Sequence, residues 1–499
     1  MPSSRNYGQA QEMLLSPYAW AHGGHTVART DDGRVVFVRH ADVGELVRVR
    51  VTDHDPKAAY WRADTVEVVE AAEHRREHHP WAAADATLAA GETPVVGGAE
   101  LGHLVLERQR AIKTEILVEL LGRIGAVPQT QLDALDPQVV VMPDEHSCGL
   151  QWRTRAHFGV DRHGVIAMHP HRDDQLVAVD DFPLMVPQLR QLRLAEVDFR
   201  GVSRVDVAAP SCLTPHGNDP HPESNHGPLI MLTPQDGNSS DCEKQAVDRV
   251  LTHVQSVAPT ASVVLKAAAG QPSRFTVLAG EGHVCECVDR FTWKVSAGGF
   301  WQIHRSAPSL LLQEIPAAAE LTAGQFVLDL YSGAGLLTTP LAHAVGETGH
   351  VMAVEGSSIT SADAVTNARE LDQVEVVCGA VDAVLHRRWP MVVRGPRGQR
   401  RRGSRKTISD VMRTGHKGAA PMFPDVVVLD PPRTGAGKSV VDAIHAVSPR
   451  RVVYLSCDPA TVSRDVARFL HHGWHVESVK GFDMYPNTHH LETLVTLVR

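Results

Sequence analysis

The chain has 499 residues, which predicts more than one domain, and its 43% apolar and 21% charged residues are close to the averages of globular proteins. No run approaches the roughly 18 uncharged apolar residues of a membrane span, and the N-terminus lacks the apolar core of a signal peptide. This excludes disordered, collagen-like and membrane-spanning chains and predicts a cytoplasmic protein. The net charge of −9 means that any nucleic-acid binding depends on local basic patches.

Cysteine and histidine usage gives no metal-site pattern. The seven cysteines are few and odd in number, and the only close pair is Cys285 and Cys287. A disulfide framework or a four-cysteine metal site is therefore not expected. The 29 histidines are scattered, without an HExxH-like helix, so we interpret them as solvated side chains and predict no bound metal.

The first 304 residues alternate between strand-like runs and turns. Residues 14–70 carry alternating apolar stretches broken by glycines, which predicts a small antiparallel, OB-like β-barrel in a domain of residues 1–72. Residues 73–125 form a linker with a helix over 107–121, where apolar residues recur at helical spacing. Residues 126–304 predict a β-rich central domain, with an exposed insertion at 210–245 that is rich in Pro, Asn, Ser and His.

Residues 305–499 have a different pattern, in which strands alternate with helices. Such alternation predicts an α/β domain with a doubly wound, Rossmann-like parallel sheet. The last two strands follow each other with no room for a helix, so the final strand is predicted to be antiparallel. Residues 394–417 form a strongly basic insertion, which is either a solvated loop or an RNA-backbone contact.

A glycine turn and an acid mark a nucleoside-binding arrangement after the first strand of this sheet. Gly333 and Gly335 lie in the turn, and Glu355 ends the next strand, where it is placed to accept hydrogen bonds from ribose hydroxyls. The third glycine of a dinucleotide fingerprint is missing at 336–338, which disfavours a nicotinamide cofactor. S-adenosylmethionine, which has no pyrophosphate, fits better.

Two further strands end in residues that carry chemistry. Asp430 follows the fourth strand and precedes two prolines, at the edge where open α/β sheets bind ligands; the alternative is a surface turn. Cys457 follows the fifth strand, and Asp458 and Pro459 predict a helix that begins directly after it. A helix N-terminus favours the thiolate, so we interpret Cys457 as a nucleophile rather than an inert core residue.

The last strand opens with Glu492. If this strand runs antiparallel beside the fifth, its beginning lies level with the end of the fifth strand. Cys457 and Glu492 are then expected to share one cleft. Without that register, a glutamate that opens an apolar strand is only a solvated side chain.

At this point the chain resembles the RNA uridine C5-methyltransferases, through GGFWQIH, VLDLYSGAG, LDPPRTGAG, YLSCDPATVSRDVARFL and MYPNTHHLETLVTL. The N-terminal YAWAHGGHTVARTDDGRVVFVRHADVGE resembles a TRAM domain, an RNA-binding β-barrel. The resemblance implies that Cys457 is the nucleophile and Glu492 the general base. It further implies a cofactor and flipped-base site made by Gln302, Tyr331, Glu355 and Asp430, with Asp382 as a weaker candidate for the adenine end.

The resemblance also implies the reaction and the partner. Thiolate addition at carbon 6 of uracil activates carbon 5 for methylation by S-adenosylmethionine, and a carboxylate then removes the carbon 5 proton. Many ribosomal RNA members carry an iron–sulfur site with Cys-Gly-Gly-Cys, but here the segment reads Val96-Gly97-Gly98-Ala99, so no iron–sulfur cluster is expected. The TRAM-like region favours 23S rRNA over tRNA as substrate; no membrane and no obligate protein partner is inferred.

Two other functions compete with this interpretation. A methyltransferase that acts on an amine also uses an acid-Pro-Pro loop, but such loops typically end in an aromatic residue and Arg433 stands here instead. A non-catalytic RNA-binding protein with a degenerate fold is the other alternative, and the intact pocket residues argue against it.

Overall fold

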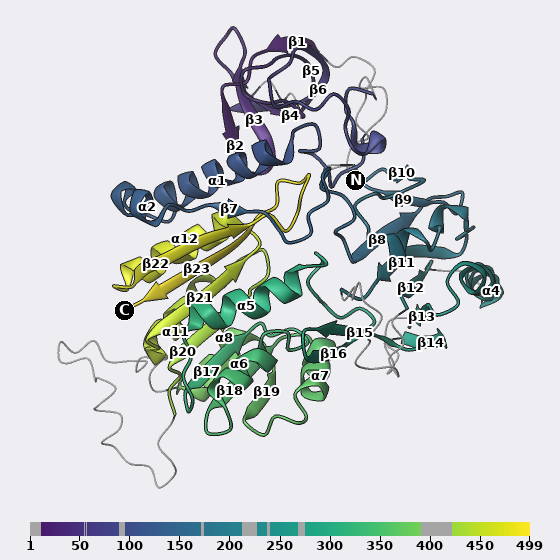
Figure 1. Cartoon of the computed structure of the whole chain (residues 1–499). Helices are drawn as coiled ribbons and strands as arrows, with labels where there is room; N and C mark the ends of the chain where they lie inside the picture. Colours follow the sequence, from purple (N-terminus) through teal and green to yellow (C-terminus); the bar gives the residue numbers. More distant parts are fainter. Residues whose placement is uncertain are drawn as a thin grey trace.

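The computed structural model describes residues 11–53, 55, 57–88, 95–170, 174–211, 227–236, 240–267, 275–390 and 422–499. Its strands form three large sheets and one separate hairpin (Figure 1). The basic insertion predicted at 394–417 lies outside the described residues. Within the described ranges, no helix combines the length and the apolar character that crossing a membrane requires.

The N-terminal region is a curled six-stranded sheet in the order β1-β5-β6-β4-β3-β2 (Figure 1). Along β4 and β5 buried and partly exposed residues alternate, as expected when one face of a sheet packs on a core. Its strands are β1 (Glu12–Leu15), β2 (Ala19–Ala21), β3 (His25–Arg29), β4 (Val35–Arg39), β5 (Leu46–Asp53) and β6 (Tyr60–Glu70).

The pairing of this N-terminal sheet differs from the all-antiparallel prediction in one respect. Strand β4 pairs with β6 in parallel, because β6 inserts between β4 and β5 in the same direction as β4. Strands β1 and β2 form the two edges, and no ladder joins these edges among the described residues. The predicted strands are therefore present, but their hydrogen bonds do not form a closed ring.

The central region is a seven-stranded sheet in the order β10-β9-β8-β11-β12-β13-β14. Helix α4 (Ser240–Val257) connects the parallel strands β12 and β13 and packs its apolar side chains on one face of this sheet. The strands are β8 (Arg155–Val160), β9 (Ile166–Met168), β10 (Val177–Ala178), β11 (Val202–Ala208), β12 (Leu229–Pro234), β13 (Ser262–Lys266) and β14 (Phe275–Ala279). Short helices α3 (Pro187–Arg190) and η3 (Leu194–Glu196) precede β11, and η2 (Ala82–Ala84) lies in the preceding linker.

The insertion predicted at 210–245 is too long. Within it, Leu229–Pro234 forms an interior strand of the central sheet, and residues from Ser240 begin α4. The apolar run LIML is paired on both sides, by β11 and by β13, so it is core rather than loop. Residues 212–226 of the predicted insertion lie outside the described residues.

The C-terminal region is an eight-stranded sheet in the order β19-β18-β17-β20-β21-β23-β22-β7. As predicted, β23 is antiparallel to its neighbours β21 and β22. The strands are β7 (Val139–Val140), β17 (Phe326–Leu330), β18 (His350–Glu355), β19 (Val374–Cys378), β20 (Val426–Leu429), β21 (Arg451–Ser456), β22 (His475–Phe482) and β23 (Glu492–Val498). The helices are α5 (Ala307–Ala319), α6 (Thr338–Val345), α7 (Ser358–Asn367), α8 (Val381–Arg388), α11 (Gly437–Val447) and α12 (Pro459–His471).

Segments that precede residue 305 also pack with this sheet. Helices α1 (Leu106–Arg123) and α2 (Gln129–Leu135) share a buried cluster with the sheet, and β7 pairs in parallel with β22. The hairpin of β15 (His283–Val288) and β16 (Phe291–Ser296) bridges two regions, since Trp293 packs with the core on the other face of this sheet while Val284 packs with β12 and β13 of the central sheet. The central domain predicted at 126–304 therefore wrongly includes 126–142, because the apolar side chains of this segment are buried by strands much later in the chain.

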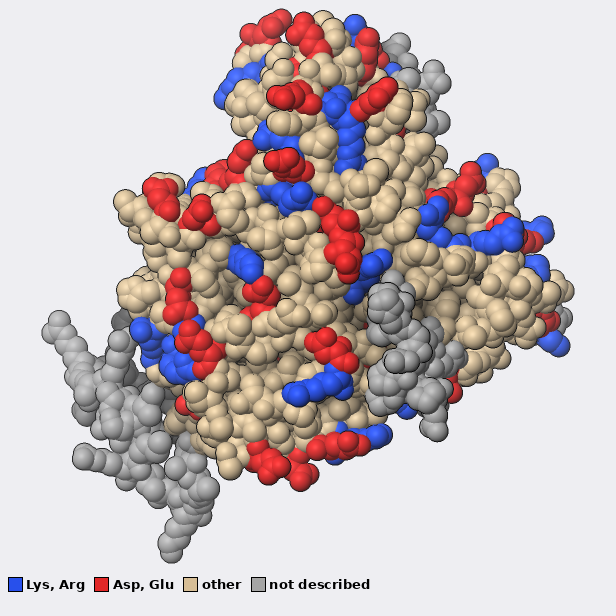
Figure 2. Space-filling model, in the orientation of Figure 1, with Lys and Arg blue, Asp and Glu red and all other residues tan. Residues whose placement is uncertain are grey.

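Charges of both signs are mixed on the surface. Figure 2 shows lysine and arginine side chains interspersed with aspartate and glutamate over the N-terminal region and around the two other sheets. No large area of one sign dominates this face, which agrees with the modest net charge of −9.

Candidate active site

A cavity of about 700 Å³ opens at the carboxyl ends of β17, β18, β20 and β21. This is the edge at which open α/β sheets bind ligands. Seven of the nine residues predicted from the sequence line it: Gln302, Tyr331, Gly333, Glu355, Asp430, Cys457 and Glu492. Asp382 lines a neighbouring cavity instead, and Gly335 lines neither.

The glycine turn and Glu355 lie at one end of the cavity, where each carboxylate oxygen of Glu355 accepts a hydrogen bond. The Glu355 carboxylate accepts hydrogen bonds from the backbone N–H groups of Gly333 at 2.9 Å and Ser357 at 2.6 Å. Gly333 has a φ of 57°, which a glycine adopts without strain. Gly335 serves the turn rather than the cavity, since its carbonyl accepts a 3.0 Å hydrogen bond from the indole of Trp293.

Tyr331 lies between this end and the neighbouring cavity that Asp382 lines. It adopts a left-handed backbone with a φ of 63°, which is costly for a residue with a side chain and is typical of functional sites. Burial and the nearby Asp382 raise the pKa of Tyr331 to about 12, so its hydroxyl stays protonated. The neighbouring cavity has a volume of about 380 Å³ and shares Tyr331 and Gly356 with the first, so the two cavities are adjacent.

Asp430 and Gln302 form the floor of the cavity between its two ends. The side-chain amide of Gln302 donates a 3.1 Å hydrogen bond to Asp430 Oδ2. Burial, followed by the nearby Asp329 carboxylate, raises the pKa of Asp430 to about 7. Asp430, at the end of β20, is therefore an acid whose charge depends on the groups beside it.

Cys457 lies at the end of β21, directly before α12. Asp458 accepts a 2.8 Å hydrogen bond from the backbone N–H of Thr461 and caps the helix, as predicted. The predicted shift toward thiolate is wrong: burial, Glu492 and Asp430 raise the pKa of the thiol to about 12. The carboxylates and the loss of water outweigh the helix terminus and the nearby Arg433, and a further cation in the cavity would oppose them.

Glu492 is the first residue of β23 and is almost completely buried. The antiparallel register pairs Ser456 with Thr493, which brings Glu492 level with Cys457, and both side chains line the cavity. Tyr485 donates a 3.1 Å hydrogen bond to Glu492 Oε2, while Oε1 is buried without a partner among the described residues. Burial, followed by Asp430, raises the pKa of Glu492 well above its usual value.

The lining residues that sequence reasoning missed as site residues include Tyr485, His490 and Arg433. Burial, followed by His489, lowers the pKa of His490 to about 3, so the ring is neutral and accepts a 3.3 Å hydrogen bond from the Arg433 guanidinium. Arg433 also partly offsets the rise in the pKa of Cys457. All three residues lie in the motifs LDPPRTGAG and MYPNTHHLETLVTL, so their positions in these motifs could have identified them.

Helix α1 forms hydrogen bonds with the loop that carries Tyr485 and His490. Lys113 donates a 2.5 Å hydrogen bond to the buried Asp483, and the side chain of Gln109 accepts one of 2.8 Å from the backbone N–H of Asn487. Asn487 has a φ of 67° and is fully buried. These contacts fix the loop between β22 and β23, and with it the hydroxyl that orients Glu492.

The N-terminal region touches the loops around the cavity. His22, in the turn between β2 and β3, lies 3.3 Å from the Asp458 carboxylate beside the cysteine. Farther along the chain, Glu100 pairs with His489 next to the lining residue His490. A macromolecule bound to the N-terminal sheet would therefore lie close to the cavity.

Comparison with known proteins identifies both ends of the chain. The family model described as tRNA (Uracil-5-)-methyltransferase matches residues 421–499, and the TRAM domain model matches residues 5–63. The first match contains Asp430, Cys457 and Glu492, three of the residues that line the cavity. The TRAM match covers nearly all of the curled N-terminal sheet.

Whole-chain relatives have the same description. A protein of Bifidobacterium longum described as an uncharacterized RNA methyltransferase is 30% identical over 515 residues, which cover 100% of both chains. One of Streptomyces avermitilis with the same description is 29% identical over 493 residues, or 98% of each chain.

A solved structure has the same fold along almost the whole chain. The crystal structure of Pyrococcus abyssi tRNA (uracil-54, C5)-methyltransferase in complex with S-adenosyl-L-homocysteine is 17% identical, with a TM-score of 0.60. The likeness covers 97% of this chain and 99% of that one. Together with the family models and the relatives, it leads to one assignment. The chain belongs to the S-adenosylmethionine-dependent RNA (uracil-5-)-methyltransferase family.

Proposed function

We propose that the protein methylates carbon 5 of a uridine in RNA through a covalent adduct with Cys457, with Glu492 as the base that removes the carbon 5 proton. The observation that carries this proposal is the meeting of a cysteine, three carboxyl groups and a glutamine around one cavity of about 700 Å³. The amine-directed alternative uses no cysteine at this position, and it leaves the half-buried Cys457 and the buried Glu492 without a role.

The cavity fits S-adenosylmethionine by charge. Three carboxyl groups line it, those of Glu355, Asp430 and Glu492, and the last has a buried oxygen without a partner among the described residues. A sulfonium cation would stabilise the ionised forms of these acids. We assign Glu355 to the ribose and the neighbouring cavity, with Asp382, to the adenine end.

The proposed reaction balances without a further reagent. The Cys457 thiol first loses its proton to water, and the thiolate adds to carbon 6 of uracil, so that the electrons of the double bond move into an enolate. Carbon 5 then takes the methyl group that S-adenosylmethionine would supply, as the sulfur–methyl bond breaks and its electrons stay on sulfur. Glu492 removes the proton from carbon 5, and the electrons of that carbon–hydrogen bond re-form the double bond and expel the Cys457 thiolate.

The side chains around the cysteine support this order of events. We assign Gln302 and Arg433, which both line the cavity, to donate hydrogen bonds to the carbonyl oxygens of uracil, where the enolate charge would develop. Tyr485 holds one oxygen of Glu492, which leaves the other to take the proton. The high pKa of the thiol matches an enzyme that forms thiolate only after the cationic cofactor has entered.

For the RNA, we propose 23S rRNA, because a TRAM domain model matches residues 5–63 and this region lies against the Cys457 loop. The second candidate is tRNA, favoured by the fold shared with the Pyrococcus abyssi tRNA enzyme. To test both, the purified protein is incubated with methyl-labelled S-adenosylmethionine and transcripts of 23S rRNA or of tRNAs. The RNA is then digested and its nucleosides are identified by mass spectrometry.

The expected product is 5-methyluridine in one RNA class only. Methylation of adenine, guanine or protein instead would contradict the proposed reaction. Product in tRNA alone would replace the rRNA assignment and leave the chemistry intact.

A further inference from the structure

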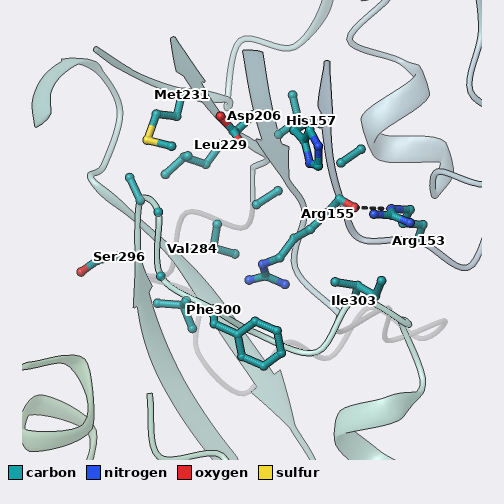
Figure 3. A pocket seen from close by; sticks show the side chains of 17 residues that line it. Arg153, Arg155, His157, Asp206, Leu229, Met231, Val284, Ser296, Phe300 and Ile303 are labelled. Atoms are coloured by element: carbon teal, nitrogen blue, oxygen red, sulfur yellow. Dashed lines mark hydrogen bonds between the residues drawn. The ribbon is translucent and has the colours of Figure 1, made fainter. Parts of the chain in front are cut away.

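A second cavity of about 320 Å³ adjoins the reaction cavity on the side of the central sheet (Figure 3). The two cavities share Gly298, Phe300 and Ile303 as lining residues. The segment from 298 to 303 is therefore a wall with the reaction cavity on one side and the second cavity on the other.

The floor of the second cavity is one face of the central sheet. Strand register aligns two rows of side chains across β8, β11 and β12 on this face: Arg155, Ala208 and Leu229, then His157, Asp206 and Met231. The opposite face is buried under α4, in a core that contains Phe158, Val205 and Ile230. The floor residues are thus the face of the sheet that α4 leaves uncovered.

The wall between the cavities is held rigidly. The Ser296 hydroxyl donates a 2.6 Å hydrogen bond to Asp363 of α7, and the Ser296 backbone N–H donates one of 3.0 Å to the same carboxylate. A Cβ atom at Gly299 would lie 2.9 Å from the carbonyl oxygen of Ser296, so this turn requires glycine. The turn therefore fixes where Phe300 emerges.

Phe300 is unusual among the aromatic residues of this wall, because 60% of its side chain is exposed. Its neighbour Trp301 is buried and donates a hydrogen bond to the Ser211 hydroxyl. An exposed phenyl ring between two cavities offers a stacking surface to a planar ligand on either side. Figure 3 shows the ring at the border of the second cavity, near Ile303.

The lining combines apolar walls with a cation. Leu229, Met231, Val284 and Val295 provide apolar surface. Figure 3 shows the Arg155 guanidinium reaching into the space between Val284 and Phe300. Arg155 donates a 2.8 Å hydrogen bond to the buried Glu286, but its Nη1 atom is buried and has no partner among the described residues.

We propose that this second cavity takes the base of a nucleotide adjacent to the target uridine in the RNA. The inference rests on the proposed function, since it requires a uridine turned out into the reaction cavity. Turning out one base unstacks its neighbours, and proteins recognise such splayed bases by stacking on aromatic or guanidinium planes and by hydrogen bonds to their edges. Continuity with the reaction cavity, the Phe300 ring and the free Arg155 donor each match that ligand.

The test uses synthetic RNA centred on the methylated uridine, in which the base of the preceding or the following nucleotide is removed, one at a time. With the wild type, loss of one of these two bases should lower kcat/KM about tenfold, the effect of losing one stacked base. The variant Met231→Trp fills the cavity. It should lower kcat/KM on intact RNA by a similar factor and show no further loss on the abasic RNA.

Val277→Trp is the matched control. Val277 is an exposed residue of β14 in the same sheet and does not line the cavity. This variant should respond to the abasic RNAs as the wild type does. Binding of S-adenosylmethionine, measured by calorimetry, should be unchanged in both variants.

A second measurement applies if Met231→Trp does not fold. RNA with 5-iodouridine at the sensitive neighbouring position is irradiated with the wild-type protein, and the cross-linked peptide is identified by mass spectrometry. Cross-links to the strands or wall of the second cavity support the proposal, whereas cross-links confined to other parts of the protein overturn it.

The outcomes separate the two proposals. Equal rates of 5-methyluridine formation on intact and both abasic RNAs overturn this inference and leave the proposed function standing. Failure to form 5-methyluridine in any RNA overturns both.

Discussion

At the glycine-turn end of the reaction cavity, both oxygens of Glu355 accept hydrogen bonds from backbone N–H groups. At the other end, Glu492 has one buried oxygen without a partner among the described residues, and the pKa values of Cys457 and Asp430 are raised to about 12 and about 7. The first end is organised before any ligand arrives. At the second, Arg433 offsets the raised pKa of Cys457 only in part, and no other described residue is a cation that lines the cavity.

From this contrast we propose that binding and reaction use different ends of the cavity. A preformed carboxylate would cost no reorganisation on meeting a ribose. The raised pKa would keep the proposed nucleophile, Cys457, protonated until a cation stabilised the ionised forms. The comparison therefore predicts that mutations at one end alter the affinity for S-adenosylmethionine, and mutations at the other end alter the chemistry.

The largest effect is expected for Cys457→Ala. Methyl transfer should fall by roughly a thousandfold or more, because the route through the adduct is lost. The affinity for S-adenosylmethionine should stay within a few-fold, as measured by calorimetry. Replacement of the exposed Cys148 by alanine is the matched control and should leave activity unchanged. Substantial turnover by Cys457→Ala would show that catalysis is not covalent.

Glu355→Ala is expected to show the opposite pattern. The loss of a charged acceptor for the ribose should weaken S-adenosylmethionine binding by about tenfold to a hundredfold. Glu370→Ala, at an exposed residue, should bind the cofactor as the wild type does. A Glu355 variant with normal cofactor affinity and a large loss of kcat would mean that the two ends are not separate.

The ionisation of Cys457 tests the same contrast without RNA. In the free protein the thiolate should form only at strongly alkaline pH, since the pKa of the thiol is raised to about 12. A bound cation stabilises the thiolate and lowers this pKa. The ultraviolet absorbance of thiolate, taken as wild type minus Cys457→Ala, should therefore appear at lower pH with sinefungin, whose amine is cationic. With neutral S-adenosylhomocysteine the shift should be much smaller, and equal shifts would contradict the electrostatic account.

The next prediction concerns stability rather than binding or chemistry. The pKa of Asp430 is about 7 in the folded protein and near 3.8 in an unperturbed carboxyl group, so the folded state binds more protons between these values and stability falls as the pH rises through that window. Asp430→Asn removes this loss and should stabilise the protein at pH 8, by on the order of a few kcal/mol. It should have little effect at pH 4.

Asp442→Asn is the control of opposite sign. Partial burial alone would raise the pKa of Asp442, but hydrogen bonds from Lys438 and His472 lower it. Its carboxylate therefore stabilises the folded protein at neutral pH, and the variant should be less stable there. Both predictions are checked by thermal unfolding of the two variants between pH 4 and pH 8. A lower stability of Asp430→Asn than of the wild type at pH 8 would contradict the account.

The sequence predicts the C-terminal sheet and its reactive edge well for a physical reason. Runs such as Phe326–Leu330 and Arg451–Ser456 are buried on both faces, and their ends are marked by Gly, Pro and helix caps. The antiparallel last strand then fixes Glu492 beside the end of β21 through register alone. Local pattern and strand order suffice for this part of the site.

Other features depend on contacts between distant segments. Strand β7 and helix α1 join the C-terminal sheet through residues more than 300 positions later, such as the Lys113 and Asp483 pair. The same contacts place Tyr485 beside Glu492, a proximity that the motif around it, MYPNTHHLETLVTL, does not indicate. The pKa of Cys457 was mispredicted because a helix terminus is visible in sequence, while burial and two carboxylates from other strands are not.

The most direct test of covalent catalysis is Glu492→Gln with an RNA substrate that contains ordinary uridine. This variant should add Cys457 to carbon 6 and transfer the methyl group, but it should fail to remove the carbon 5 proton. A protein–RNA adduct that survives denaturing electrophoresis should accumulate, contain the transferred methyl group, and be absent from the double variant that also carries Cys457→Ala. Normal release of 5-methyluridine by Glu492→Gln, with no adduct at any time, would contradict the assigned roles of Cys457 and Glu492.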